Sequence, residues 1–221
     1  MLHKRTICSR KEFGVTVTND ILRVVIDPKR GLKLVTTREQ SLAAARDEDQ
    51  QQGQTPKQTV PARPGPPNMP GTFTFIPKAD VAAQMLNTRG DRPVRVVPIA
   101  NNANLGAFIL HYETMKNTTP VNAFYHSEIS ELYYVIRGSG TALLGGELQN
   151  ATWDDSNSDA IRQVRGPSVN GTMKNYQTVK WTAGDTIIVP AGVPHAMGQE
   201  VTERTDILRV VFDPKKSIQL K

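Results

Sequence analysis

Short apolar stretches, separated by glycine, proline and asparagine, run through the last two thirds of the chain and set its character. Their lengths and their content of β-branched and aromatic residues predict strands rather than helices. The expected strands are Val94–Ile99, Leu105–Thr114, Leu132–Arg137, Thr141–Leu144, Gln177–Trp181, Thr186–Val189 and Ile207–Phe212. One short amphipathic helix is expected before them, at Pro77–Leu86. Many short strands with frequent turn signals are typical of an all-β sandwich or barrel.

Residues 36–71 have neither strand nor helix periodicity over most of their length. A run rich in glutamine and acidic residues is followed there by a stretch rich in proline and glycine. Such a composition predicts a linker or an extended arm, partly polyproline-like. We therefore divide the chain into an N-terminal segment (residues 1–35), this linker or arm (36–71) and one β domain (72–221).

A ten-residue sequence occurs twice. Asp20–Lys29 reads DILRVVIDPK and Asp206–Lys215 reads DILRVVFDPK, so nine of the ten positions are identical. The spacing is too long for a solenoid repeat, and the copy covers a single strand. Duplication of a last strand explains it. The N-terminal copy could pair within its own domain, add to a partner's sheet edge, or be vestigial.

Composition and charge exclude several classes of protein. The net charge of +6 is carried mainly by residues 1–60, which leaves the β domain almost balanced and without the basic, aromatic-lined face of a nucleic-acid binder. Cys8 is the only cysteine, so no intramolecular disulfide and no cysteine metal site is available. No apolar run is long enough for a signal sequence or a membrane span. We expect a cytoplasmic protein that binds neither nucleic acid nor membranes.

Two segments contain residues suited to metal binding. Phe124–Gly138 reads FYHSEISELYYVIRG, and Gly184–Gln199 reads GDTIIVPAGVPHAMGQ. In a strand, residues two apart share a face, so a hairpin after His126 can bring Glu131 back beside it. A second hairpin, turning at a glycine with positive φ, leads to His195. Two hairpins that cross in a barrel would place two imidazoles and one carboxylate around one point and leave coordination positions open.

These segments resemble the two signature motifs of the cupin superfamily. The first family motif is matched by His126, Glu131 and Gly138. The second is matched by Gly184, Pro190, Gly192 and His195, with Gln199 in place of the usual asparagine. The resemblance covers roughly Thr72–Lys216 and is closest to small single-domain bacterial cupins. It implies a jelly-roll (double-stranded β-helix) barrel, commonly a homodimer, with one divalent metal ion inside: iron, manganese, nickel or zinc.

The chain departs from the family pattern at one ligand. Phe124 stands where the first motif histidine is expected, so the site either works with His126, Glu131 and His195 alone or recruits another residue. His111, on the preceding strand, is the candidate replacement, although the sequence favours a buried histidine that does not bind the metal directly. A cupin that kept its fold and lost its metal is the alternative.

The fold does not determine the reaction. We expect a metal-dependent enzyme that polarises an oxygen of a small, partly hydrophobic substrate, with Tyr133 and Glu131 as candidate catalytic residues. Lyase, isomerase, decarboxylase and, with iron, dioxygenase chemistry all remain open. A non-catalytic small-ligand or sugar-binding protein and an assembly protein are the other classes. The segment Glu147–Lys180 is expected to be a long loop whose Arg162, Arg165 and Lys174 either steer an anionic substrate or are simply solvated.

Overall fold

The computed structural model describes residues 10–11, 14–15, 23–24, 73–86, 90–99, 103–117 and 121–221. Contacts along the backbone divide the chain into two units, residues 1–69 and 70–221. In the first unit, β1 (Arg10–Lys11) pairs with β2 (Gly14–Val15) in antiparallel fashion. Most of the N-terminal strand copy and all of the predicted linker lie outside the described residues.

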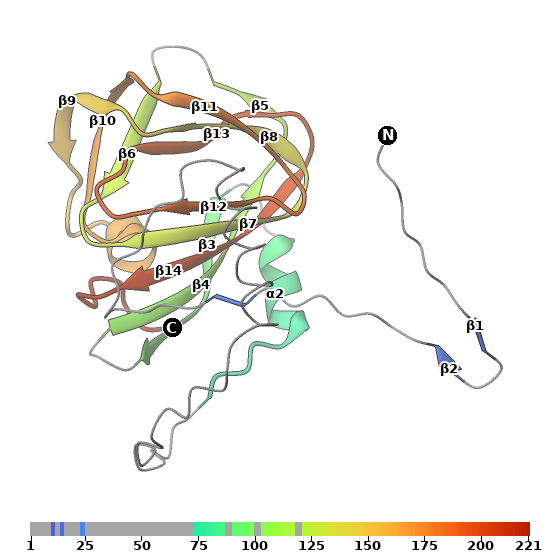
Figure 1. Ribbon diagram of the computed structural model, residues 1–221. Coiled ribbons are helices and arrows are strands. Elements are labelled where there is room, and N and C mark those ends of the chain that lie inside the picture. Colours follow the sequence, from blue (N-terminus) through green and yellow to red (C-terminus); the bar gives the residue numbers. More distant parts are fainter. Residues whose placement is uncertain are drawn as a thin grey trace, which may run out of the picture. The chain divides into compact units, whose positions relative to one another are not determined.

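The second unit is a jelly-roll barrel made of two antiparallel sheets (Figure 1). The five-stranded sheet has the order β12-β7-β14-β4-β3, and the other has the order β11-β8-β13-β6-β10-β9 with β5 paired to β13. The first sheet comprises β3 (Gly90–Ile99), β4 (Ala103–Tyr112), β7 (Ser130–Arg137), β12 (Thr186–Val189) and β14 (Thr205–Asp213). The second comprises β5 (Met115–Lys116), β6 (Asn122–His126), β8 (Ser139–Leu144), β9 (Glu147–Trp153), β10 (Ser168–Lys174), β11 (Gln177–Thr182) and β13 (His195–Val201).

The predicted all-β barrel and the short helix are confirmed. Helix α2 spans Lys78–Met85, and each predicted strand is present with its ends shifted by a few residues at most. Apolar side chains from both sheets meet between them, among them Val135 and Ile207 from one sheet and Trp181 and Met197 from the other. This core is the hydrophobic layer that an alternating strand pattern demands.

The predicted hairpins are wrong. β6 and β7 lie in different sheets, as do β12 and β13, so each connection crosses the barrel instead of folding a strand back on its neighbour. The periodicity of a strand shows which residues share a face, but it does not show whether the next strand joins the same sheet. The crossings still bring the two motifs together, because the Gly192 N–H donates to the carbonyl of His126 at 2.7 Å.

The segment Glu147–Lys180 is not a loop. It contains β9, β10 and a five-residue π-helix, η2 (Ile161–Arg165). Alternation of polar residues hid β9, which is exposed along most of its length. A π-helical turn is rare and is found frequently at functional sites.

Candidate metal centre

Three strands from both sheets bring His126, Glu131 and His195 together inside the barrel. His126 ends β6, Glu131 is the second residue of β7, and His195 begins β13. The Nε2 atom of His126 lies 3.1 Å from Glu131 Oε1, and that of His195 lies 3.2 Å from Oε2. All three side chains are at most 2% exposed. The structure therefore assembles the three residues that the sequence singled out as metal ligands.

The hydrogen bonds of the two histidines assign their protons. Ser168 donates its hydroxyl to the carbonyl of Gly166 at 2.8 Å, so its oxygen must accept from His126 Nδ1, also 2.8 Å away. His195 Nδ1 lies 3.0 Å from the carbonyl of Val193, which can only accept. A neutral imidazole at either position consequently has its proton on Nδ1 and a lone pair on Nε2. Both lone pairs face the Glu131 carboxylate.

Glu131 is held ionised. The guanidinium of Arg209 donates to Oε1, and the Tyr133 hydroxyl donates to Oε2 at 2.6 Å. Burial would raise the pKa of Glu131, but the positive charge of Arg209 holds that pKa well below its ordinary value. Glu131 is thus suited to bind a cation and not to act as an acid.

The neighbours of Glu131 have shifted pKa values of their own. Burial lowers the pKa of His126, which keeps the ring neutral and able to bind a metal. Burial and the negative charge of Glu131 raise the pKa of Tyr133 well above its ordinary value. Tyr133, predicted as a donor or acid, is therefore a neutral phenol whose hydroxyl also lies 3.4 Å from His195 Nε2.

Arg209 connects the site to the edge of the five-stranded sheet. It is 2% exposed, and its Nε lies 3.0 Å from Asp91 Oδ2. Burial raises the pKa of Asp91 to about 6, although the charge of Arg209 opposes that rise. Arg209 lies in β14, the C-terminal copy of the duplicated sequence, where Arg23 is its counterpart. In β14, Arg209 shares a face with Ile207 and Val211, which are both buried, so alternation along this strand was the signal that the arginine could point inward.

Phe124 lies beside both histidines. Its backbone pairs with His195, and its ring centroid lies 4.8 Å from that of His195 and 5.2 Å from that of His126. The Phe124 ring thus forms an apolar wall next to the two imidazoles.

His111 lies outside this group. Its Nδ1 is 2.6 Å from Asp206 Oδ1, and its Nε2 is 3.1 Å from Glu113 Oε1. Because carboxylates face both ring nitrogens, His111 does not supply the fourth ligand in this arrangement and matches the alternative reading of a buried histidine.

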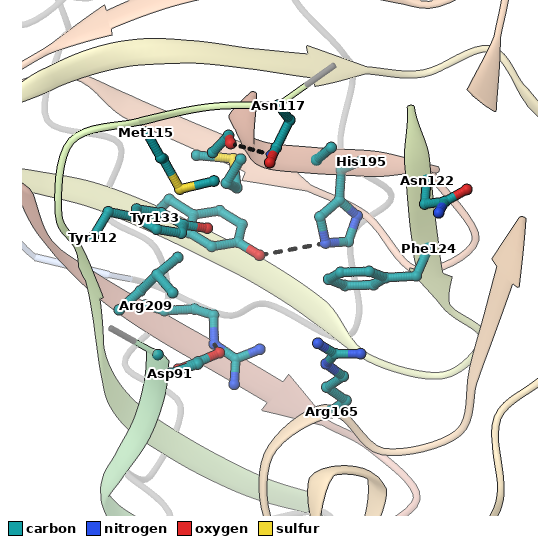
Figure 2. Close-up of a pocket in the computed structure, with 15 residues that line it drawn as sticks. Asp91, Tyr112, Met115, Asn117, Asn122, Phe124, Tyr133, Arg165, His195 and Arg209 are labelled. Atoms are coloured by element: carbon teal, nitrogen blue, oxygen red, sulfur yellow. Dashed lines mark hydrogen bonds and ion pairs between the residues drawn. The ribbon is translucent and has the colours of Figure 1, made fainter. Parts of the chain in front are cut away.

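A cavity of about 280 Å³ opens onto the site (Figure 2). Tyr133 and His195 line it, together with the apolar side chains of Phe124 and Met197, whereas His126 and Glu131 are not among the lining residues. Arg165 also lines the cavity, whereas Arg162 and Lys174 do not. Ser168, Arg209 and Asp91 were not predicted as site residues. Ser168 had no signal in the sequence, because its contact with His126 joins residues 42 positions apart.

Comparisons with known proteins give fold-level similarity only. No protein-family model and no curated relative matches the sequence. A cupin-2 domain-containing protein from Shewanella frigidimarina is 12% identical, covers 61% of this chain and 92% of its own, and has a TM-score of 0.33. A protein from Bacillus halodurans is 11% identical, with coverages of 66% and 85% and a TM-score of 0.38. The DMSP lyase DddQ from Ruegeria pomeroyi is 14% identical, with coverages of 49% and 38% and a TM-score of 0.29.

These similarities are too low to assign an activity to this chain, which spans well under half of the lyase. Among the residues that the structure describes, no helix has the length and apolar character needed to cross a bilayer.

Proposed function

We propose that this chain is a metal-dependent enzyme of the cupin type, which binds one divalent ion through His126 Nε2, the Glu131 carboxylate and His195 Nε2. Its substrate is a small organic molecule that enters the cavity lined by Phe124, Tyr133 and Met197. Iron, manganese, nickel and zinc all suit two imidazoles and one carboxylate.

The observation that carries this proposal is a buried ring nitrogen that makes no hydrogen bond and faces a carboxylate. His126 Nε2 is buried and makes no hydrogen bond, although Glu131 Oε1 is only 3.1 Å away. His195 Nε2 faces the other oxygen of the same carboxylate at 3.2 Å, and its one further neighbour, the Tyr133 hydroxyl, lies at 3.4 Å. Orphaned acceptors in a buried site cost free energy unless something positive satisfies them. A metal ion satisfies both nitrogens and the carboxylate together.

The spacing of the ligand atoms fits a metal. Two ligand atoms that each lie about 2.1 Å from an ion, at right angles to each other, are separated by about 3.0 Å. The two histidine–carboxylate distances, 3.1 and 3.2 Å, are close to that value. Three protein ligands leave positions for substrate and water, as catalytic sites require.

A bound ion would act as a Lewis acid on a substrate oxygen, and with iron the same ligand set also allows oxygen chemistry. The chain's own residues position the substrate and control protons. Tyr133 keeps its proton at neutral pH because of its raised pKa, so its hydroxyl is a hydrogen-bond donor beside His195. Phe124 and Met197 exclude water from one side of the cavity and favour a partly hydrophobic substrate.

A metal-free small-ligand protein is the second candidate, and one observation favours it. Both oxygens of Glu131 already have a donor, Arg209 on one side and Tyr133 on the other. The carboxylate is therefore stable without a metal, and a cavity of this kind could hold a ligand by hydrogen bonds alone.

Elemental analysis of protein purified without added metal separates the two candidates. We expect near-stoichiometric metal in the wild type and its loss in a His126→Ala/His195→Ala double variant. His111→Gln is the matched control, since His111 is also a buried histidine but lies outside the ligand group, and it should retain the metal. Circular dichroism checks the fold of each variant. No metal in the wild type, even after reconstitution, would leave the metal-free binding protein.

The expectation of a homodimer stays a prediction. Sedimentation of the purified chain tests it, and a monomer at micromolar concentration would contradict it.

A further inference from the structure

Arg165, the second arginine that lines the cavity, does not contact any of the three proposed metal ligands. Arg165 ends η2, and its guanidinium carbon lies 4.6 Å from the centroid of the Phe124 ring. Figure 2 shows the two side chains next to each other. Stacking of a guanidinium on an aromatic face orients the plane of the cation. Phe124 thus provides both an apolar wall and a support for a positive charge.

The turn that presents Arg165 is held at several points. Arg209 Nη2 donates to the carbonyl of Val164 at 2.8 Å, and Gln219 N–H donates to that of Arg162 at 2.9 Å. Gly166, with a φ of +61°, closes the turn, and a Cβ there would lie 2.4 Å from Ile129 Cδ1. The Ser168 hydroxyl donates to the Gly166 carbonyl, and the same hydroxyl accepts from His126 Nδ1. Arg165 and the metal ligand His126 are therefore positioned by one segment.

The two arginines that line the cavity differ in their ion pairs. Arg209 is engaged with Glu131 and Asp91. Within the described part of the chain, Arg165 forms neither an ion pair nor a hydrogen bond: its guanidinium stacks on the Phe124 ring, and its charge acts on Asp91 only from beyond ion-pair distance. The cavity therefore has one positive charge that is oriented but unpaired, next to the proposed ion.

We infer that Arg165 binds the carboxylate of the substrate, which is a small acid carrying a hydroxyl or carbonyl oxygen close to its carboxylate. The inference rests on the proposed function in one respect: that second oxygen is the one the metal would polarise. The planar guanidinium offers two parallel N–H donors, which match the two oxygens of a carboxylate.

The surroundings favour a single negative charge over a phosphate. Among the described residues, only one guanidinium without an ion pair lines the cavity, and Asp91, another lining residue, would repel a dianion. The cavity of about 280 Å³ is at the small end for ligand sites, which limits the substrate to a few carbons or one ring.

Calorimetric titration of the metal-containing protein with glycolate, lactate and mandelate, each beside its neutral amide, tests this inference. We expect at least one acid to bind about tenfold or more tightly than its amide, and Arg165→Gln to weaken that acid by about ten- to a hundredfold. Arg165→Lys should recover only part of the loss, because a lysine has the charge without the planar fork. Arg162→Gln is the matched control, as Arg162 lies on the same turn but does not line the cavity.

The two proposals fail in different ways. Metal content is measured on the same samples and should be unchanged in Arg165→Gln, since Arg165 is not a ligand. A wild type that holds metal yet binds no acid, binds acids no better than amides, or binds them equally well after Arg165→Gln would overturn the inference alone. A wild type that binds acids through Arg165 but holds no metal would overturn only the proposed enzyme.

Discussion

Ser168→Ala is the perturbation that tests the histidine arrangement most directly. The hydroxyl of Ser168 is 1% exposed, accepts the Nδ1 proton of His126 and donates to the Gly166 carbonyl. Removing it leaves Nδ1 without an acceptor, and water cannot easily replace the lost oxygen. The proton of His126 can then move to Nε2, where Glu131 lies 3.1 Å away. That tautomer has no lone pair for a metal.

The expected magnitudes follow from these contacts. Loss of a hydrogen-bond partner that orients a metal-binding histidine typically lowers metal affinity by about ten- to a hundredfold, or about 1.4–2.7 kcal/mol. The unfolding free energy of the metal-free protein should fall by about 1–3 kcal/mol, because one buried carbonyl loses its donor. Metal affinity and stability therefore respond to different parts of the same substitution.

Competition with a chromophoric chelator measures the metal affinity, and urea unfolding of the metal-free protein measures the stability. Ser127→Ala is the control, since Ser127 also donates to a carbonyl of this segment, that of Pro167, but does not contact a histidine. An affinity in Ser168→Ala within twofold of the wild type would refute the assignment of the His126 proton.

Three further outcomes are expected. Phe124→His should raise metal affinity by about tenfold or more in the same chelator assay, because residue 124 lies beside both ligand histidines; no gain would show that the site cannot use a fourth ligand. Arg209→Met should lower the free energy of unfolding by about 3–5 kcal/mol, because Glu131 and Asp91 would lose a buried cation. Thermal unfolding measures this loss, and a loss below about 1 kcal/mol would mean that water enters the site and solvates the two carboxylates. The pKa of Asp91 is raised on folding from 3.8 to about 6. Its contribution to the free energy of unfolding is therefore fully present below about pH 4 and is lost as the pH rises through 6. The total loss is at most about 3 kcal/mol. Urea unfolding of the wild type and Asp91→Asn across pH 4–7 checks this, and parallel profiles would contradict it.

The sequence predicted the elements of the barrel and the ligand trio because both depend on local patterns. Strand periodicity located the core-facing residues, and the spacing around His126 and His195 was long enough to be specific. The order of the strands within the sheets does not follow from such patterns, so the crossings between the sheets were mistaken for hairpins.

The rest of the site depends on contacts between distant residues. Arg209 and Glu131 are 78 positions apart, and no local sequence pattern near either residue predicts the ion pair between them. Arg165 was noted among three basic residues, but only the π-helical turn and the Phe124 ring distinguish it from Arg162. Asp91 likewise depends on its place opposite Arg209 at the edge of the five-stranded sheet.

The position of β14 between β7 and β4 has a consequence for synthesis of the protein. A ribosome makes both neighbours first, and 67 residues separate the end of β7 at Arg137 from the start of β14 at Thr205. Until β14 arrives, the inner edges of β4 and β7 are unpaired, and Glu131 lacks its arginine. The nascent chain has by then already produced Asp20–Lys29, which matches the late strand at nine of ten positions. Until β14 is made, the five-stranded sheet therefore lacks its central strand, while the chain already contains an earlier segment with nearly the same sequence.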